Sequence, residues 1–198
     1  MNEISKLGVQ NTMEKRKIAV AITGASGSIY AQRFLNTLSK IHNLEIGLVL
    51  SQNAKDVWKW EIGEEFHVDS SVSIYEQNNY FAPFASGSSK YEALVIIPCS
   101  MGTIGRIAHG LSDDLITRTA DVMFKEKRKL ICVIRETPLN LIHLKNLVQV
   151  TEAGGIILPA NPSFYSKPKN IEELVDTVLH RVFDHLNIDV PTFRWGNH

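Results

Sequence analysis

The sequence predicts an α/β protein with a single doubly wound parallel sheet. Three observations lead to this fold class. Short apolar runs without polar interruption suit strands that are buried on both faces. Segments with helical spacing of apolar residues separate these runs. Small or hydroxyl-rich turns follow several of the runs directly. This alternation favours a three-layer sandwich of the Rossmann or flavodoxin type, and 198 residues with 44% hydrophobic residues fit one domain.

The first expected strand, 18–22, and the first expected helix, 29–38, enclose a small-residue turn at 23–28. Small residues there let backbone N–H groups and a helix N-terminus approach a phosphate. Of the glycine-rich dinucleotide pattern only Gly24 and Gly27 are present, with Ser26 between them. A plain tight turn is therefore the alternative to a phosphate site.

A second buried strand is expected at 44–50. It ends at Ser51, which suits the cap of the next helix and is also a candidate ligand contact. That helix, from about residue 53, carries Glu61 near its end, where the helix dipole does not favour an acid. Glu61 is therefore either solvated or functional. We expect a minor strand within 67–77 and then an aromatic loop at 78–89, a composition that favours contact with a partner.

A third strand at 93–97 leads into a second hydroxyl-rich turn, 98–103. Ligands of open α/β sheets lie beyond the carboxyl ends of the strands, so both turns should face one crevice. A helix at 113–125 begins with two acids and ends at Lys125, in agreement with its dipole. A fourth strand, 130–134, delivers Arg135 and Glu136 at its end. Such a pair indicates function, and a structural ion pair is the alternative.

The last expected elements are a helix at 139–149, a strand at 156–158, a rigid aromatic loop at 159–165 and a helix at 171–186. Arg181 lies near the edge of the apolar face of that final helix. The predicted strand-end loops together carry hydroxyls, one cation and one acid, a set that suits phosphorylated ligands. These residues are Ser26, Ser51, Ser100, Thr103, Arg135, Glu136 and Tyr165.

Charge and composition exclude several function classes. Lys plus Arg and Asp plus Glu both total 21, which argues against binding nucleic acid or an anionic membrane. No apolar run approaches the roughly 18 residues of a membrane span. Cys99 and Cys132 lie in apolar runs and are expected to be buried reduced thiols. We expect a cytoplasmic protein with a flexible tail at 1–16 and one domain at 17–198.

Two catalytic classes find little support. The seven histidines are scattered and no Cys-x-x-Cys occurs, so no metal site is expected. Ser26 is flanked by Gly24, Ala25 and Gly27 rather than lying in Gly-x-Ser-x-Gly, which argues against a serine hydrolase. Enzymes that bind phosphate esters and a flat ligand remain.

Several segments, in this order and spacing, resemble the UbiX-type flavin prenyltransferases from about residue 17 to residue 195. They are GASGS, APFASGS, PCSMGT, LSDDLITRTADVMFKEKR, RETPLNLIHLKN, LPANPSFY and RW. The resemblance implies that reduced FMN accepts a dimethylallyl group from dimethylallyl monophosphate, first at flavin N5 and then at C6, without a metal ion.

The resemblance also implies a role for individual residues. Those matching flavin-binding positions are Gly24, Ala25, Ser26, Ser51, Ser100, Met101, Gly102, Thr103 and Arg135. Those matching substrate-binding positions, chiefly around the prenyl phosphate, are Lys125, Arg118, Tyr165, Arg181 and Trp195. Glu136, Ser26 and Glu61 match positions near the reacting centre, where Glu136 would take the ring proton and Ser26 would relay protons.

The family likeness further implies a homo-dodecamer built of trimers, with sites at subunit contacts, and delivery of prenylated FMN to a UbiD-type decarboxylase. Two alternatives are open. One is an FMN-dependent decarboxylase of the cysteine-decarboxylase group, whose characteristic His and Asn-rich motif are not recognisable here. The other is a flavin carrier that catalyses no reaction. The presence of Lys125, Glu136, Tyr165 and Arg181 argues against it. An assay of turnover without any partner protein would distinguish these alternatives from a prenyltransferase.

Overall fold

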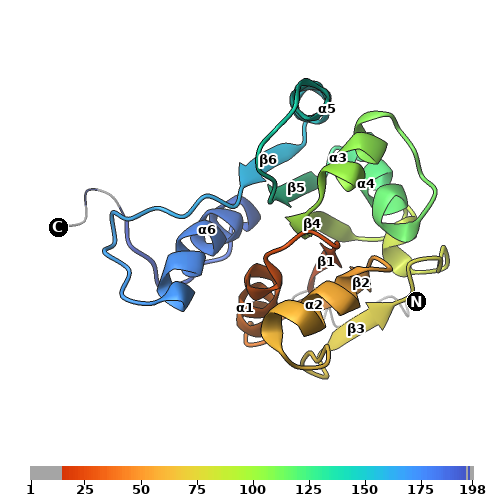
Figure 1. The fold of residues 1–198 in the computed structure, drawn as a ribbon. Coiled ribbons are helices and arrows are strands. Elements are labelled where there is room, and N and C mark those ends of the chain that lie inside the picture. Colours follow the sequence, from red (N-terminus) through yellow and green to blue (C-terminus); the bar gives the residue numbers. More distant parts are fainter. Residues whose placement is uncertain (1–14, 195, 197–198) are drawn as a thin grey trace, which may run out of the picture.

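The computed structural model describes residues 15–194 and 196. Its strands form one six-stranded parallel sheet in the order β3-β2-β1-β4-β5-β6 (Figure 1). The strands are β1 (Arg16–Ile22), β2 (Leu44–Leu50), β3 (Val72–Tyr75), β4 (Tyr91–Cys99), β5 (Lys129–Ile134) and β6 (Ile156–Pro159). The order reverses between β1 and β4, which is where open α/β sheets bind ligands. The predicted fold class is confirmed.

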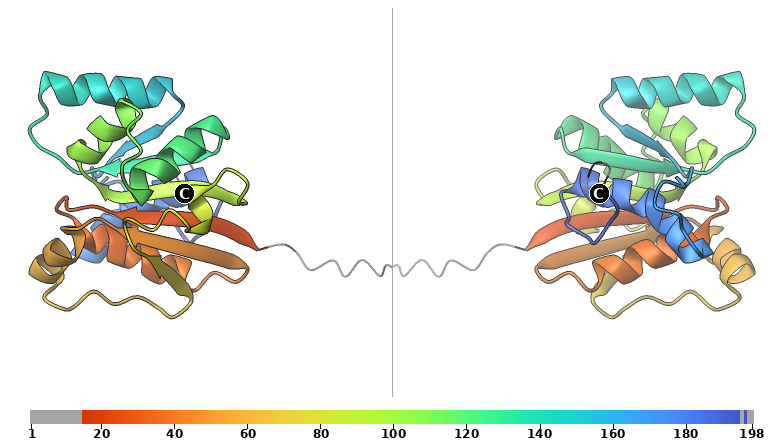
Figure 2. Two further views of the ribbon diagram at one scale, coloured as in Figure 1. Left: turned by 90° about the vertical axis from the view of Figure 1, so that its right-hand side faces the viewer. Right: turned by 90° about the vertical axis from the view of Figure 1, so that its left-hand side faces the viewer.

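Helices cover both faces of this sheet (Figures 1 and 2). They are α1 (Ser28–Leu38), α2 (Ala54–Ile62), α3 (Met101–Ala108), α4 (Leu115–Lys125), α5 (Leu141–Glu152) and α6 (Ile171–Leu186), with a short 3-10 helix, η1 (Pro83–Ala85). Because side chains alternate along a strand, Ile18 and Val20 of β1 pack in the core that α1, α2 and α6 cover. Ala19 and Ala21 pack in the core under α3 and α4. The result is the predicted three-layer sandwich.

Several element bounds differ from the predicted ones. Strand β4 continues through Pro98 to Cys99, beyond the predicted end at 97. The pairing of β4 with β5 shifts register between Ile96 and Cys99, an irregularity at which a strand tolerates proline. Ser51 does not cap α2, because Asn53 holds the capping position and the Ser51 carbonyl only accepts from the Ala54 N–H.

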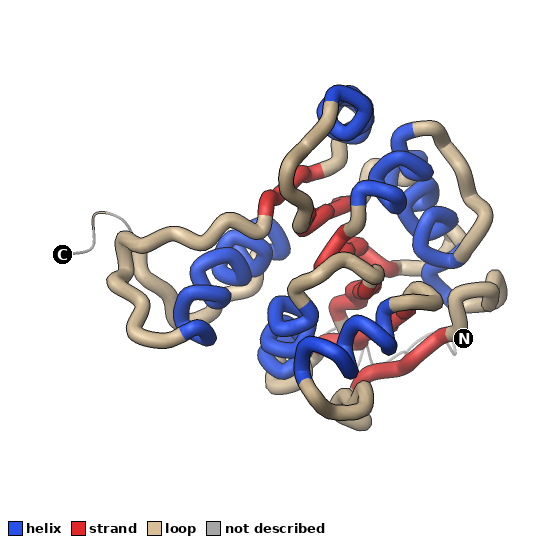
Figure 3. Tube along the Cα trace, in the orientation of Figure 1, coloured by secondary structure: helices blue, strands red, loops and turns tan. Residues whose placement is uncertain are grey.

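The helices α4 and α5 begin later than predicted because each has a cap of its own. Asp114 precedes α4 and accepts a hydrogen bond from the Thr117 N–H at 2.8 Å. Asn140 precedes α5 and accepts from the His143 N–H, also at 2.8 Å. Capping side chains satisfy N–H groups that have no partner inside the helix, which fixes where the helix starts. Figure 3 shows α4 beside β4 and β5, and α5 near β6, the last strand of the sheet.

Two predictions concern residues near the ends of the chain. Arg16, the last residue of the expected tail, is the first residue of β1, and its side chain pairs with Glu92. The rest of that tail up to residue 14 lies outside the described residues, as does Trp195. Within the described part of the chain, no helix is long and apolar enough to cross a membrane.

Candidate functional site

The turns after β1, β4 and β5 meet at one edge of the sheet, because parallel strands end on the same side. Thr23, which is buried, joins the first two turns: its hydroxyl donates to the Pro98 carbonyl at 2.7 Å and accepts from the Ser100 N–H at 2.9 Å. Arg135 joins the turn after β5 to the other two turns. Its backbone N–H donates to the Cys99 carbonyl, and its Nε donates to the Ser26 carbonyl at 3.0 Å. The turns therefore lie together at one edge of the sheet, as predicted.

The turn after β1 already holds a carboxylate of the chain. Glu61 comes from the end of α2, and its Oε2 accepts from the Gly27 N–H at 2.8 Å and the Ser28 N–H at 2.7 Å. Gly27 adopts a left-handed conformation, with φ of 115°, at the start of α1. Burial raises the pKa of Glu61, but hydrogen bonds from Ser26, Ser28 and Gly27 outweigh it and lower that pKa overall. Glu61 is therefore a carboxylate anchored at the α1 N-terminus.

The turn after β4 has a different arrangement. Ser100 caps α3, and its Oγ accepts from the Thr103 N–H at 3.3 Å and lies 3.1 Å from the Thr103 hydroxyl. Met101 and Thr103 are buried, whereas Gly102 is exposed and has open space where a Cβ would lie. An exposed helix N-terminus with a hydroxyl beside it suits a phosphate group.

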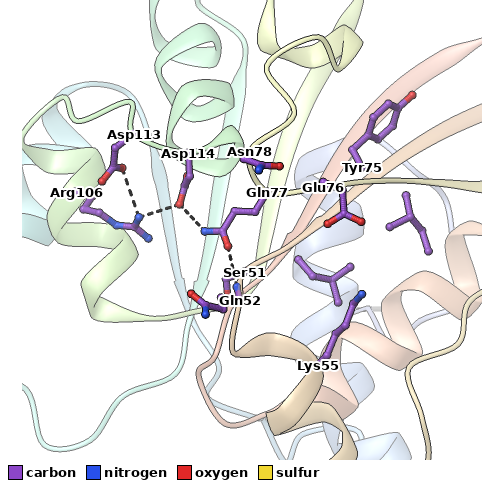
Figure 4. Close-up of a pocket in the computed structure, with 12 residues that line it drawn as sticks. Ser51, Gln52, Lys55, Tyr75, Glu76, Gln77, Asn78, Arg106, Asp113 and Asp114 are labelled. Carbon is purple, nitrogen blue, oxygen red and sulfur yellow. Dashed lines mark hydrogen bonds and ion pairs between the residues drawn. The ribbon is translucent and has the colours of Figure 1, made fainter.

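A cavity of about 520 Å³ lies beside Ser51, between the ends of β2 and β3, the last turn of α3 and the start of α4 (Figure 4). Its lining includes the cations Lys55 and Arg106 and the acids Glu76, Asp113 and Asp114. Burial raises the pKa of Asp114, but hydrogen bonds from Thr117 and Gln77 and the charge of Arg106 lower it overall. Asp114 is consequently ionised at neutral pH.

Tyr165 and Arg181, predicted for the prenyl phosphate, line one cavity of about 480 Å³ beside β6 and α6. The Arg181 Nη1 lies 2.6 Å from Asp184 Oδ2, and the other oxygen of Asp184 lies 2.6 Å from Arg194 Nη1. The Arg181 side chain is still 63% exposed, so its remaining donors face the solvent. The structure brings these two predicted residues together.

Lys125 and Arg118 do not join that cavity within one chain. Lys125 ends α4 just before β5 begins, at the amino edge of the sheet and opposite the crevice. Arg118 donates through Nε to the Ala85 carbonyl at 3.0 Å and lies 3.3 Å from Asp121. Both residues are therefore placed away from Tyr165 and Arg181 of the same chain.

Comparisons with known proteins agree with the geometry. The family model described as Flavoprotein matches residues 7–183. A curated flavin prenyltransferase UbiX from Methanocaldococcus jannaschii is 44% identical, over 91% of this chain and 98% of the relative. The chain belongs to the UbiX family of flavoproteins.

Two solved UbiX structures have the same fold. One, AnUbiX (PadA1) in complex with FMN and dimethylallyl pyrophosphate, is 40% identical and superposes with a TM-score of 0.84, covering 91% of this chain and 99% of the other. The second is described as a dodecameric FMN-dependent UbiX-like decarboxylase from Escherichia coli O157:H7. It is 33% identical with a TM-score of 0.85, covering 91% of this chain and all of the other.

In this UbiX protein Glu136 lies exposed at the rim of the crevice. Its Oε1 accepts from the Thr137 N–H at 3.0 Å, and the neighbouring Arg135 side chain points to Ser26. Among residues 15–194 and 196, no ion pair joins Arg135 to Glu136. The alternative of a structural pair is not supported, and both side chains are available to a ligand.

Sequence reasoning missed three residues that organise the UbiX crevice. Thr23 joins two turns, Gln77 contacts the loop after β2, and Asp114 accepts hydrogen bonds from Gln77 and Arg106. Only Thr23 had a usable signal, a hydroxyl directly at the end of a buried strand. In the described part of the chain, no group of three or more His, Cys, Asp or Glu side chains could hold a metal ion.

Proposed function

We propose that this protein is a flavin prenyltransferase that moves a dimethylallyl group from dimethylallyl monophosphate to N5 and C6 of reduced FMN. One observation carries the proposal: two sets of phosphate-type donors lie at one sheet edge, and Glu136 follows β5, the strand that lies between β4 and β6. The first set is the α3 N-terminus with Ser51, and the second is Tyr165 with Arg181. The Ala160 N–H donates to the Ile134 carbonyl at 2.9 Å, which keeps the second set beside Arg135.

The donor chemistry of the first set fits FMN. We assign the flavin to Gly24, Ala25 and Ser26, to Ser51, to residues 100–103 and to Arg135, because helix N–H groups, hydroxyls and a guanidinium recognise phosphate oxygens. Gly24 lies against the loop after β2, where an added Cβ would be 3.1 Å from the Asn53 Cβ. That close approach keeps the first turn and the Ser51 loop together.

The second set would stabilise the leaving phosphate. An allylic phosphate that ionises without a metal needs positive charge already in place, which Arg181 and Arg135 supply, while Tyr165 donates a hydrogen bond. When the prenyl group closes onto flavin C6, the proton on that carbon must leave. Glu136, exposed at the rim, is assigned as the base that accepts it, and Ser26 as a relay toward solvent.

We assign Lys125 to the site of a neighbouring subunit, because in its own chain it lies at the opposite edge of the sheet. The exposed face of α5 supports close contact between copies. Leu141 is 65% exposed, Ile142 68% and Val148 55%, and these residues form an apolar surface on one helix. The dodecameric E. coli relative is consistent with such an assembly. We therefore propose a homo-dodecamer of trimers.

The test is an anaerobic incubation of the purified protein with FMN, dithionite and dimethylallyl monophosphate, without added metal or partner protein. Mass analysis of the released flavin should show FMN plus one prenyl unit. Bound but unchanged FMN would favour the decarboxylase or carrier alternatives, and no FMN binding would refute the site. We also propose that a UbiD-type decarboxylase receives the product, in the cytoplasm, where the free thiols Cys99 and Cys132 stay reduced.

A further inference from the structure

The loop that carries Ser51 is linked to α4 through Gln77, whose backbone carbonyl also accepts from the Leu115 N–H at 2.8 Å. Gln77 lies in the connection after β3, and its Oε1 accepts from the Gln52 N–H at 2.8 Å. Its Nε2 donates to Asp114 Oδ2, also at 2.8 Å. Both polar ends of the amide are therefore used, one on each side of the cavity shown in Figure 4.

The Asp114 end of this link is rigid. The Asp114 side chain is only 8% exposed, and its two oxygens accept from the Thr117 N–H and from Arg106 Nη1 at 2.8 Å each. Arg106 belongs to α3, the helix whose first turn is residues 100–103. Gln77 therefore connects the Ser51 loop to the helix that presents the second turn of the crevice.

The Ser51 end has fewer constraints. On the β1 side, the Ser51 N–H donates to the Ile22 carbonyl at 2.9 Å, and Asn53 packs against Gly24. On the other side lies the cavity of about 520 Å³, so the loop has space to shift when the Gln77 contact is absent. The side chain of Gln77 restrains the loop in that direction.

We propose that Gln77 is a positioning residue that sets the spacing between Ser51 and residues 100–103, and so the affinity for the phosphate of FMN. The inference rests on the proposed function, which assigns both groups to the flavin. Gln77 acts through the Gln52 backbone and through Asp114, without a contact of its own to the ligand. Hydrogen-bond donors must be held in place to bind a phosphate tightly, because a mobile donor loses entropy when it binds.

The experiment exchanges donor and acceptor between the two side chains. Gln77→Glu keeps the acceptor for the Gln52 N–H but turns an oxygen toward the Asp114 carboxylate, so FMN should bind about tenfold more weakly. The double variant Gln77→Glu with Asp114→Asn restores the bond with its direction reversed, and Asn is as good a helix cap as Asp. The amide nitrogen introduced at position 114 also faces Arg106 Nη1, so we expect this variant to recover only part of the lost FMN affinity. Asp114→Asn alone completes the cycle, and Asn36→Asp, at an exposed position of α1, is the charge control.

Three measurements are made on each variant: the FMN dissociation constant from flavin fluorescence, the KM of the prenyl donor at saturating FMN, and the melting temperature without ligand. The positioning role predicts that FMN affinity falls by more than the change in melting temperature accounts for, with an unchanged donor KM. Wild-type affinity in Gln77→Glu, or no recovery in the double variant, would overturn the inference. So would losses of FMN affinity that simply follow losses of melting temperature. A wild type that binds no FMN would instead refute the proposed function, and this inference with it.

Discussion

Replacing Glu61 by Gln should lower the stability of the free protein, because the carboxylate anchors the start of α1. Its Oε2 accepts two backbone hydrogen bonds, from Gly27 and Ser28, at 2.8 and 2.7 Å. The Gln side chain keeps one acceptor oxygen but loses the negative charge at the positive end of an 11-residue helix. The perturbation thus removes the charge and leaves a neutral, weaker acceptor for both hydrogen bonds.

The magnitude follows from these contacts. Loss of a capping side chain costs about 1 kcal/mol, and loss of a charge at a helix terminus costs about 0.3–1 kcal/mol. Glu61 is exposed, so solvent screening reduces the charge contribution. We expect a total of about 1 kcal/mol, which for a domain of this size lowers the melting temperature by about 2–4 °C.

The pH dependence distinguishes this mechanism from a general loss of packing. The pKa of Glu61 is lowered in the folded protein relative to its ordinary value of 4.5. As pH falls below 4.5, the unfolded chain binds the proton first, so the stabilisation present at higher pH is lost as pH passes through the folded pKa. The difference between wild type and Glu61→Gln should therefore be full at pH 7 and disappear in acid.

Thermal unfolding followed by circular dichroism between pH 3 and pH 8 measures this difference directly. Glu64→Gln serves as the matched control, because Glu64 is exposed two residues after the end of α2. It should melt like wild type at every pH. An unchanged melting temperature of Glu61→Gln at pH 7, or a deficit of equal size at both ends of the pH range, would refute the anchoring role.

Further predictions concern catalysis. Glu136→Gln should bind FMN normally but slow ring closure about a hundredfold or more. Mass analysis should then show an N5-prenylated flavin that accumulates. Equal loss of folding and FMN affinity would contradict this prediction. Arg181→Ala should raise the KM for the prenyl donor about tenfold and leave the FMN constant unchanged. Co-expressed Lys125→Ala and Glu136→Gln subunits should regain activity in about a quarter of their sites if Lys125 acts in the neighbouring subunit. Turnover should be unchanged by EDTA, and a loss restored by added metal would exclude metal-independent transfer.

The sequence predicted well which residues lie at the carboxyl ends of the strands, because this prediction needs only the local pattern of a buried strand and the turn after it. Ser26, Ser100 and Arg135 each follow a buried strand, and parallel strands end on the same side. The contact of Arg135 with the Ser26 carbonyl also needs the length of the arginine side chain, because β4 lies between β1 and β5. The predicted starts of α4 and α5 were wrong because the caps Asp114 and Asn140 overrode the apolar pattern.

Other parts of the site depend on tertiary placement, for which the sequence has no local signal. Glu61 reaches Gly27 across 34 positions because α2 packs beside the first turn. Gln77 lies in a short polar connection without periodicity, and nothing in it indicates a contact with Asp114. Lys125 lies at the end of α4, where the helix dipole favours a positive charge. Its place in the sequence therefore indicates no further role.

The two turns that the sequence presents as similar are therefore unequal in the folded protein. At the first turn the Gly27 and Ser28 N–H groups already bind the Glu61 carboxylate, and a phosphate there would have to displace a like charge. At the second turn no hydrogen bond within the described part of the chain uses the Gly102 N–H, and Gly102 is exposed. A phosphate is thus bound more favourably at the start of α3. The first turn instead holds the ionised Glu61 carboxylate beside Ser26.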